Sequence, residues 1–210
     1  MINLKCNLRT AEAADIKSIV SVHIISFPGF FLTFLGPQFL KELYLGIMND
    51  NYGILLVAEK EGDTVGFVAG SVAPNGFYRR LLQKRWWRFA LPVISAALKK
   101  PSVIQRFLRV AKNVFFTNGQ SHESSALLMS IAVLPKIQRS GAGGLLVKAF
   151  CTACEKQGVS IVSLTTDKFE NDSVNLFYRT HGFSMAKEIT TDENRVMNKY
   201  VVILGSVQNL

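Results

Sequence analysis

The stretch that most constrains the fold of this chain is a glycine-rich turn between an apolar β-run and an amphipathic helix. The run over residues 126–134 ends at Pro135, and the next helix begins with three glycines in four positions, Gly141, Gly143 and Gly144. Glycine has no Cβ, so successive backbone N–H groups can approach a ligand closely. The positive end of the helix dipole favours an anion at the same place. The pattern predicts an α/β fold with a cradle for a diphosphate.

Two familiar nucleotide sites do not fit this turn. No Gly-Lys-Ser/Thr completes a P-loop, and no Gly-x-Gly-x-x-Gly with an acidic residue about 20 positions later marks a Rossmann site. The sequence therefore predicts a diphosphate site of a different kind.

Hydrophobic periodicity divides the rest of the chain into short strands and amphipathic helices. A helix follows Thr10, with apolar residues at helical spacing from Ile16 to Ile24, and Pro37 opens a second helix. The turn at 60–63 predicts a hairpin. Strands are expected at 3–8, 54–59, 64–73, 126–134, 161–166, 183–188 and 196–204, and further helices at 141–156 and 172–181.

Composition limits the class of protein. Apolar residues make up 49% of the 210 residues and charged residues 19%, which is enough for a sizeable core and excludes wholesale disorder. This length suits a single domain, expected over residues 1–210. Three cysteines make no disulfide framework and indicate a reducing compartment, so we expect a cytoplasmic protein. The uncharged stretch at 18–40 is broken by Pro28-Gly29 and Gly36-Pro37, which favours two buried helices over a membrane span.

The basic residues are concentrated in one segment. The chain has a net charge of +9, yet residues 75–119 contain ten basic residues and no acidic one, so the remainder is close to neutral. We interpret residues 76–120 as a helical insertion between two strands. A solvated helix surface is the plain interpretation; docking on anionic lipid through 77–117, or attraction of a phosphorylated substrate, are the alternatives. No nucleic-acid reader motif accompanies the charge, so no nucleic-acid partner is expected.

The turn and a segment thirty residues later together resemble the GCN5-related N-acetyltransferase (GNAT) family. That family's coenzyme A loop has the pattern Gln/Arg-x-x-Gly-x-Gly/Ala after a strand ending in Val-x-Pro, and this chain has Gln138, Gly141 and Gly143 after Val133-Leu134-Pro135. The family's second signature is matched by Asn171, Tyr178 and Gly182-Phe183. The resemblance is close over residues 126–186 and only in outline over the first 75. It implies a mixed, mostly antiparallel sheet flanked by helices.

The resemblance also implies acetyl-CoA as co-substrate and supplies candidate residues. The strand segment Ser130-Ile131-Ala132-Val133 should part from its neighbour, and Ile131, Ala132 and Val133 should contact the pantetheine arm and thioester, with the Val133 N–H polarising the carbonyl. Asn171 is expected to bond the pantetheine arm, and Tyr178 to be the general acid for the leaving thiolate. The loop that holds the diphosphate is expected to comprise Gln138, Arg139, Ser140, Gly141, Ala142, Gly143 and Gly144.

The general base is where the match weakens. Family members often carry Glu on the strand before the loop, but residues 126–130 contain no carboxylate. Glu123 is our first choice, ahead of His122, and Asp167 after the neighbouring strand is a third candidate. An amine must lose its proton before it attacks, and a substrate of low pKa, such as an amino sugar, would need little help from a base.

The expected function is acetyl transfer to a primary amine of a small molecule or amino sugar, by direct attack in a ternary complex. Cys151 and Cys154 lie on the packing face of a helix and are not expected to form an acyl-enzyme or bind metal, and no metal is expected elsewhere. Two alternatives remain: a non-catalytic acyl-CoA-binding module, and an acyltransferase docked on anionic lipid. The sequence does not indicate the acceptor or the oligomeric state.

Overall fold

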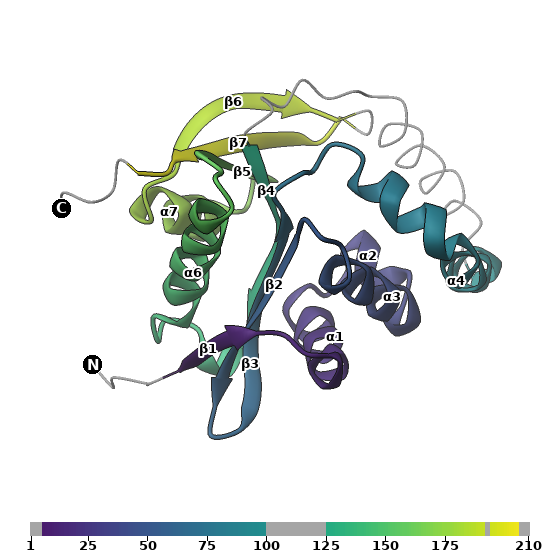
Figure 1. Ribbon diagram of the computed structural model, residues 1–210. Coiled ribbons are helices and arrows are strands. Elements are labelled where there is room, and N and C mark those ends of the chain that lie inside the picture. Colours follow the sequence, from purple (N-terminus) through teal and green to yellow (C-terminus); the bar gives the residue numbers. More distant parts are fainter. Residues whose placement is uncertain (1–5, 100–124, 192–193, 206–210) are drawn as a thin grey trace.

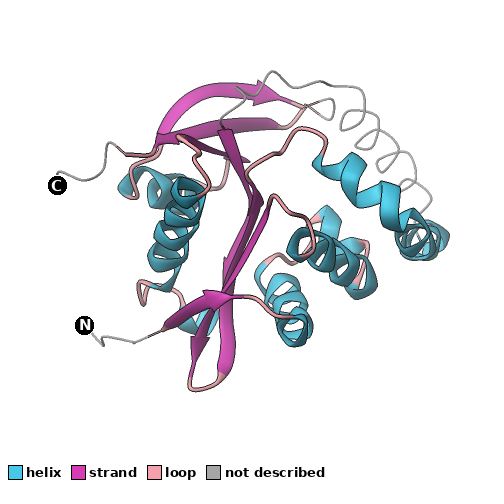
Figure 2. Cartoon of the chain, in the orientation of Figure 1, coloured by secondary structure: helices cyan, strands magenta, loops and turns pink. Residues whose placement is uncertain are grey.

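The computed structural model describes residues 6–99, 125–191 and 194–205. Its centre is a seven-stranded sheet in the order β1-β2-β3-β4-β5-β7-β6, in which every pair is antiparallel except β4 with β5. Helices cover both faces (Figures 1 and 2). The strands are β1 (Asn7–Thr10), β2 (Gly53–Lys60), β3 (Asp63–Ser71), β4 (Ser125–Val133), β5 (Ile161–Asp167), β6 (Ser184–Thr190) and β7 (Val196–Ile203). The mixed, mostly antiparallel sheet expected from the sequence is thereby confirmed.

Two apolar layers hold the helices to the sheet. On one face pack α1 (Ile16–Ser26), α2 (Phe31–Phe34), α3 (Pro37–Met48) and α4 (Phe77–Lys99), and on the other α6 (Ala142–Lys156) and α7 (Asp172–Thr180) (Figure 1). Alternation along β3 divides its side chains between the layers: Phe67 and Ala69 belong to the first and Val68 to the second. Val65 also belongs to the second layer, because a bulge opposite Ala58 and Glu59 interrupts the alternation before Gly66.

Local sequence signals set most of the boundaries. The hairpin between β2 and β3 turns at Glu61 and Gly62, which both have positive φ, as a two-residue turn of this kind requires. Pro37 stands at the start of α3, directly after Gly36. Between α1 and α3 the chain forms the short helix α2.

Strand β4 is irregular on both sides. Against β3 its register shifts between Ala69 and Gly70, which leaves Met129 as the extra residue of a bulge. Against β5 it pairs only over Ser125–Leu127, whereas β5 continues to pair with β7 as far as Asp167. Beyond Leu127, β4 therefore has its partner on one side only, which is the parting expected for this strand.

The first half of the basic segment is a helix. Helix α4 occupies 77–99, between β3 and β4, and residues 100–124 lie outside the described part of the chain. Across residues 6–99, 125–191 and 194–205, no helix combines the length and apolar character needed to cross a bilayer.

Candidate active site

The turn after β4 exposes backbone donors. A short 3-10 turn (η2, Pro135–Ile137) follows β4, Arg139 and Gly141 then adopt positive φ of 62° and 89°, and α6 begins at Ala142. The N–H of Leu145 bonds back to the Gly141 carbonyl at 3.1 Å, as the first full helical bond. The amides before it, from Gly141 to Gly144, have no partner within the helix. Such a succession of N–H groups at a helix start is a concave anion site.

The turn between β4 and α6 also contains a strained backbone residue, Arg139, and a buried hydroxyl without a partner within the described structure, that of Ser140. A non-glycine residue in the left-handed region, such as Arg139, costs about 1 kcal/mol. The Oγ of Ser140 is buried and has no hydrogen-bond partner within the described structure. Gln138 and Arg139 have exposed side chains, and Gln138 Nε2 lies 3.4 Å from the Val133 carbonyl. An anion accepting from the Ser140 hydroxyl and the helix amides would satisfy donors that the protein leaves open.

The three glycines at the start of α6 are each required by the structure, but for different reasons. Gly141 needs its positive φ and would have open space around a Cβ. Gly143 and Gly144 instead face α7: a Cβ on Gly143 would lie 3.3 Å from the Phe177 ring, and one on Gly144 would collide with Nε2 of His181. The last two glycines thus let the start of α6 pack directly against α7, which the sequence did not reveal.

The unpaired part of β4 presents two backbone positions to the gap beside β5. The N–H of Leu134 bonds to the Val65 carbonyl of β3 at 2.9 Å, so the alternation of the strand turns the backbone groups of Ile131 and Val133 away from β3. The groups of Ala132 face β3. The Val133 carbonyl accepts from the Ser26 hydroxyl at 3.4 Å.

A buried polar cluster that the sequence analysis missed fixes α7 to the sheet. The Asn175 carbonyl oxygen accepts from Thr166 Oγ1 at 2.7 Å and Asn198 Nδ2 at 3.2 Å. Its amide donates to the main-chain carbonyls of Asp167 and Asn171, at 3.1 and 3.0 Å. Asn171 stands at the N-cap of α7 and donates its own amide to the Asp167 carbonyl at 3.3 Å. These bonds hold Asn171, and with it the start of α7, at the end of β5.

Tyr178 lies one helical turn after Asn175 and is 5% exposed. Its ring packs edge-on against Phe177 and Phe183 and lies 6.2 Å from the Tyr200 ring, centre to centre. Burial raises the pKa of the Tyr178 phenol above its ordinary value, because the anion would lose its hydration. The phenol is therefore protonated at neutral pH and is a hydrogen-bond donor.

The candidate bases have different outcomes. Both Asp167 carboxylate oxygens accept from Arg195, at 2.6 and 2.8 Å, so this carboxylate is engaged at the end of β5. Glu123 and His122 lie outside the described residues.

The opposite face of β4 carries a hydrogen-bonded chain that links three elements. His23 of α1 and Tyr44 of α3 are almost fully buried, and Nδ1 of His23 lies 2.6 Å from the Tyr44 hydroxyl. The Tyr44 hydroxyl donates, over a long 3.5 Å, to Oγ of Ser130, which belongs to the part of β4 without a β5 partner. The Tyr44 hydroxyl has one proton, so when it donates to Ser130 it can only accept from the Nδ1–H of His23. The Ser130 oxygen has two lone pairs, and one of them is then left to accept from another donor.

The protonation state of His23 follows from its burial. Desolvation lowers the pKa of His23 to about 4, and its Nε2 is buried with no partner within the described structure. The ring is enclosed by Phe27 and Phe67, at 4.8 and 6.4 Å between ring centres. Neutral His23 thus holds the Tyr44 hydroxyl in place through their short contact.

Comparison with known proteins decides the family. The model of the acetyltransferase (GNAT) family matches residues 19–183. The chain belongs to this family. Among curated protein sequences, none matches the chain significantly. The GNAT assignment therefore rests on the family model, and the fold agrees with it.

Solved structures resemble this GNAT protein along nearly its whole length. Ard1 from Thermoplasma volcanium is 17% identical, with a TM-score of 0.60 over 94% of this chain and 97% of that one. The ribosomal-protein-S18-alanine N-acetyltransferase of Escherichia coli is 14% identical, with a TM-score of 0.57 over 98% and 99%. The PaiA N-acetyltransferase of Thermoplasma acidophilum, in complex with coenzyme A, is 12% identical, with a TM-score of 0.58 over 93% and 98%. At these identities the likeness shows the fold.

Burial disfavours ionisation of the two cysteines of α6, Cys151 and Cys154. Burial is the main cause that raises the pKa of Cys151 to about 11 and of Cys154 to about 12. Neither thiol ionises readily at neutral pH, and the thiolate is the nucleophile. This agrees with the expectation that they pack within the helix.

Proposed function

We propose that this protein transfers the acetyl group of acetyl-CoA to a primary amine of a small molecule or amino sugar, by direct attack in a ternary complex. The observation that carries the proposal is the parting of β4 from β5 beside the glycine turn. It leaves the backbone groups of Ile131 and the N–H of Val133 available at the place where α6 begins, while the Val133 carbonyl accepts from Ser26 and Gln138. We further propose that residues 1–210 form one domain and that the reaction takes place in the cytoplasm.

The turn would hold the diphosphate of the co-substrate. The amides of Gly141 to Gly144 and the Ser140 hydroxyl supply neutral donors, and the exposed Gln138 and Arg139 flank them. Acetyl-CoA supplies an acetyl thioester. Ile131, beside Ala132 on β4, and Asn171 at the start of α7 would bond its pantetheine arm, one from each side of the gap.

The reacting carbonyl would lie against β4. Its oxygen gains negative charge as the amine nitrogen bonds to the carbonyl carbon, and the Val133 N–H is directed to stabilise that charge. On the other face, the free lone pair of Ser130 accepts an N–H of the amine and so directs the nitrogen lone pair at the carbonyl carbon. Tyr44 and His23 act only through Ser130, as positioning residues.

The leaving group departs as the carbon–sulfur bond breaks, and the thiolate accepts a hydrogen bond from Tyr178. Because burial raises the pKa of Tyr178, this phenol stabilises the thiolate without giving up its proton. The proton that the amine loses as the carbon–nitrogen bond forms ends on the sulfur, so the products are the N-acetyl compound and free coenzyme A. Glu123, ahead of His122, is our choice to carry that proton through water, and no metal takes part.

Ligand-induced thermal stabilisation tests co-substrate binding. Acetyl-CoA at a hundred times its Kd should stabilise the fold by about 2.7 kcal/mol, seen as a raised Tm. Gly141→Asp should abolish the rise, because it places a carboxylate where the diphosphate binds. Gly158→Asp is the matched control: Gly158 also has positive φ and open space, at the far end of α6. No rise for the wild type, or an equal rise in Gly141→Asp, contradicts the proposal.

An acyl-CoA-binding module without catalysis is the second candidate. It is favoured by the lack of a carboxylate on β4. A panel of primary amines and amino sugars, assayed for free thiol release from acetyl-CoA, separates the two. Acetylation of one acceptor class supports the enzyme, and tight acetyl-CoA binding without any acceptor supports the module.

A further inference from the structure

Helix α4 is apolar on two opposite sides. Its inner side packs into the core of the molecule, through Phe77, Leu81, Phe89 and Ala96. Its outer side carries Trp87, Leu91, Ile94 and Leu98, at the spacing i, i+4, i+7 and i+11 of a single helical stripe. We call these four residues the outer face of α4. A helix with apolar residues all round is normally covered on both sides.

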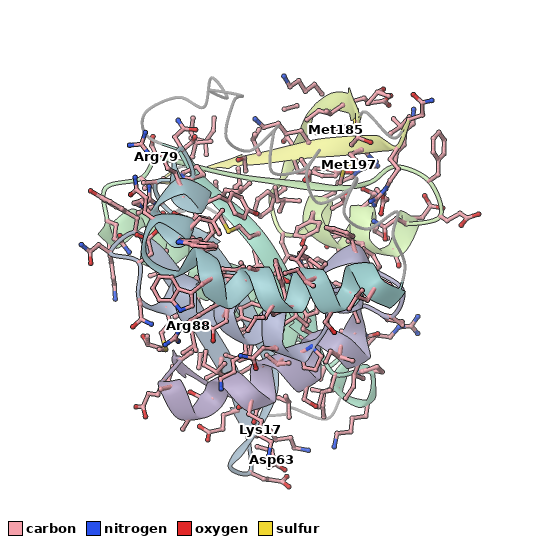
Figure 3. The ribbon with its side chains drawn as sticks, turned by 90° about the vertical axis from the view of Figure 1, so that its right-hand side faces the viewer. Lys17, Asp63, Arg79, Arg88, Met185 and Met197 are labelled. Atoms are coloured by element: carbon pink, nitrogen blue, oxygen red, sulfur yellow. The ribbon has the colours of Figure 1, made fainter. Side chains whose placement is uncertain are left out.

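Nothing in the described ranges 6–99, 125–191 and 194–205 covers the outer face. Leu91 is 73% exposed and Leu98 83%, and Trp87 and Ile94 are more than half exposed. Trp86, 62% exposed, stands beside them. Scattered single apolar residues on a surface are ordinary, but a continuous stripe with two tryptophans marks an interaction surface. Figure 3 looks onto this side of the molecule, where α4 crosses in front.

The sequence of α4 is strongly basic. Residues 77–99 contain six basic residues and no acidic one. Arg79 is exposed and Arg88 is half exposed, and Figure 3 labels both on the α4 side. Apolar side chains with tryptophan at the boundary and cations at the rim are the composition of helices that lie in the headgroup layer of an anionic membrane.

Charge also argues against other occupants. In a symmetric dimer built on this face, α4 would lie against its own copy, and a helix with six basic residues and no acidic one would face the same sequence. Among the described residues, Arg80 and Arg88 have carboxylate partners, Asp50 and Glu42. The segment that follows in sequence, 100–119, would bring four further basic residues and no acidic one. An anionic lipid surface instead offers opposite charge and an apolar layer together.

We propose that the outer face of α4 docks this protein on anionic phospholipid membranes. The helix lies parallel to the surface, with Trp87, Leu91, Ile94 and Leu98 inserted at the level of the headgroups and Arg79 among the lipid phosphates. The docking is peripheral and reversible. It does not depend on the acetyltransferase function proposed above.

The chain contains its own reporter for this proposal. Its only two tryptophans are Trp86 and Trp87, both on α4, so intrinsic fluorescence reports on this helix alone. The full chain should co-sediment with phosphatidylcholine vesicles that contain phosphatidylglycerol, and its emission should shift to shorter wavelength. Vesicles of phosphatidylcholine alone should bind far less, and added salt should weaken binding to the anionic vesicles.

Paired variants locate the contact. Leu91→Gln with Leu98→Gln should weaken vesicle binding roughly a hundredfold, because two leucines no longer leave water. Arg79→Gln should weaken it about fivefold, for one cation near the surface. Gln83→Ala with Ser95→Ala, at exposed polar positions of the same helix, is the matched control and should bind like the wild type.

Three results would overturn the proposal. The first is an unchanged emission spectrum with no co-sedimentation on anionic vesicles. The second is full binding by the double leucine variant. The third is self-association in analytical ultracentrifugation that this variant abolishes while neither protein binds vesicles, which would make the face a contact between copies. Thermal stabilisation by acetyl-CoA, measured on each variant, reports separately on the fold and the co-substrate site.

Discussion

The polar groups on the two sides of β4 come together in different ways: on one side from neighbouring segments of the sequence, on the other from distant ones. The segment from β4 through α6 and β5 to α7 places its polar groups by short spacings along the chain: the turn at 138–144, then Asn171 and Tyr178. The side formed by α1 and α3 depends on contacts between distant segments, since His23 and Tyr44 are 21 residues apart and Tyr44 and Ser130 are 86 apart. A motif can therefore locate the first side, whereas only the folded chain shows the second.

Tyr178→Phe is the strongest test of the site on the α6 and α7 side of β4. Loss of the phenol O–H should lower kcat about a hundredfold or more, because the thiolate leaves without a donor, while acetyl-CoA affinity stays nearly unchanged. The measurement is steady-state kinetics with the best acceptor of the amine panel, alongside calorimetric titration with acetyl-CoA.

Tyr200→Phe is the control for that variant. Tyr200 is also buried, in the same aromatic cluster, but its hydroxyl lies 3.4 Å from Nε of Arg179. It should retain nearly full kcat. Equal losses in both variants would mean that packing, not proton donation, is responsible.

Gly144→Ala tests the packing that positions the turn. The new methyl group collides with the exposed ring of His181, which must move away, while alanine favours the helix. The free energy of unfolding should therefore fall by only about 1 kcal/mol in urea denaturation, and acetyl-CoA should bind more weakly. Adding His181→Ala makes room and should recover part of the loss. If the losses of unfolding free energy in the two single variants simply add in the double variant, the contact between Gly144 and His181 does not explain the effect.

Buried His23, on the α1 and α3 side of β4, should make the stability of the protein depend on pH. His23 has a pKa of about 4 in the folded chain against its ordinary 6.5, so the unfolded chain binds the proton first as the pH falls. Stability should drop by about 2 kcal/mol between pH 7 and pH 5, and the drop should level off below about pH 4.

Urea unfolding at a series of pH values measures this effect. His23→Gln should remove that part of the slope, whereas His181→Gln, at an exposed position, should leave it in place. A wild-type profile that is flat across this range would show that His23 is not buried as a neutral ring.

Ser130→Ala should give the smallest effect. Removing the hydroxyl should raise KM for the amine about tenfold and leave the Kd for acetyl-CoA unchanged, because Ser130 contacts only the acceptor in the proposed complex. Ser130→Thr keeps an acceptor oxygen and should recover most of the affinity for the amine. A change in acetyl-CoA affinity instead would assign Ser130 to the co-substrate side.

Most of the fold was predictable because local signals agreed with the tertiary structure. The hairpin at 60–63, the Pro37 helix start and the helix over 142–156 were each marked by a turn residue, a cap or a clear periodicity. The strand order was not predictable from these signals alone and came only with the family resemblance. The first strand lies at Asn7–Thr10, later than expected, because its pairing with β2 determines its limits.

The site was predictable only where chemistry and sequence spacing coincide. The turn and its helix carry a motif, but the packing role of Gly143 and Gly144 depends on α7, which lies thirty residues further on. Asn175 was missed because one buried amide inside an amphipathic helix has no pattern of its own. Its role became visible only when Thr166 and Asn198 from two strands were found to share its oxygen.

Strands β4 and β5 pair at only three residue positions, so the sheet consists of two halves that are weakly joined. One half contains the four strands from β1 to β4, and the other contains β5, β7 and β6. In the proposed complex, acetyl-CoA bonds to Ile131 on β4 and to Asn171, which is itself hydrogen-bonded to the end of β5, and so links the two halves of the sheet. Amide hydrogen exchange should then slow on β4 and on β5 together when the co-substrate binds, so that occupancy of the site and stiffness of the whole sheet rise as one.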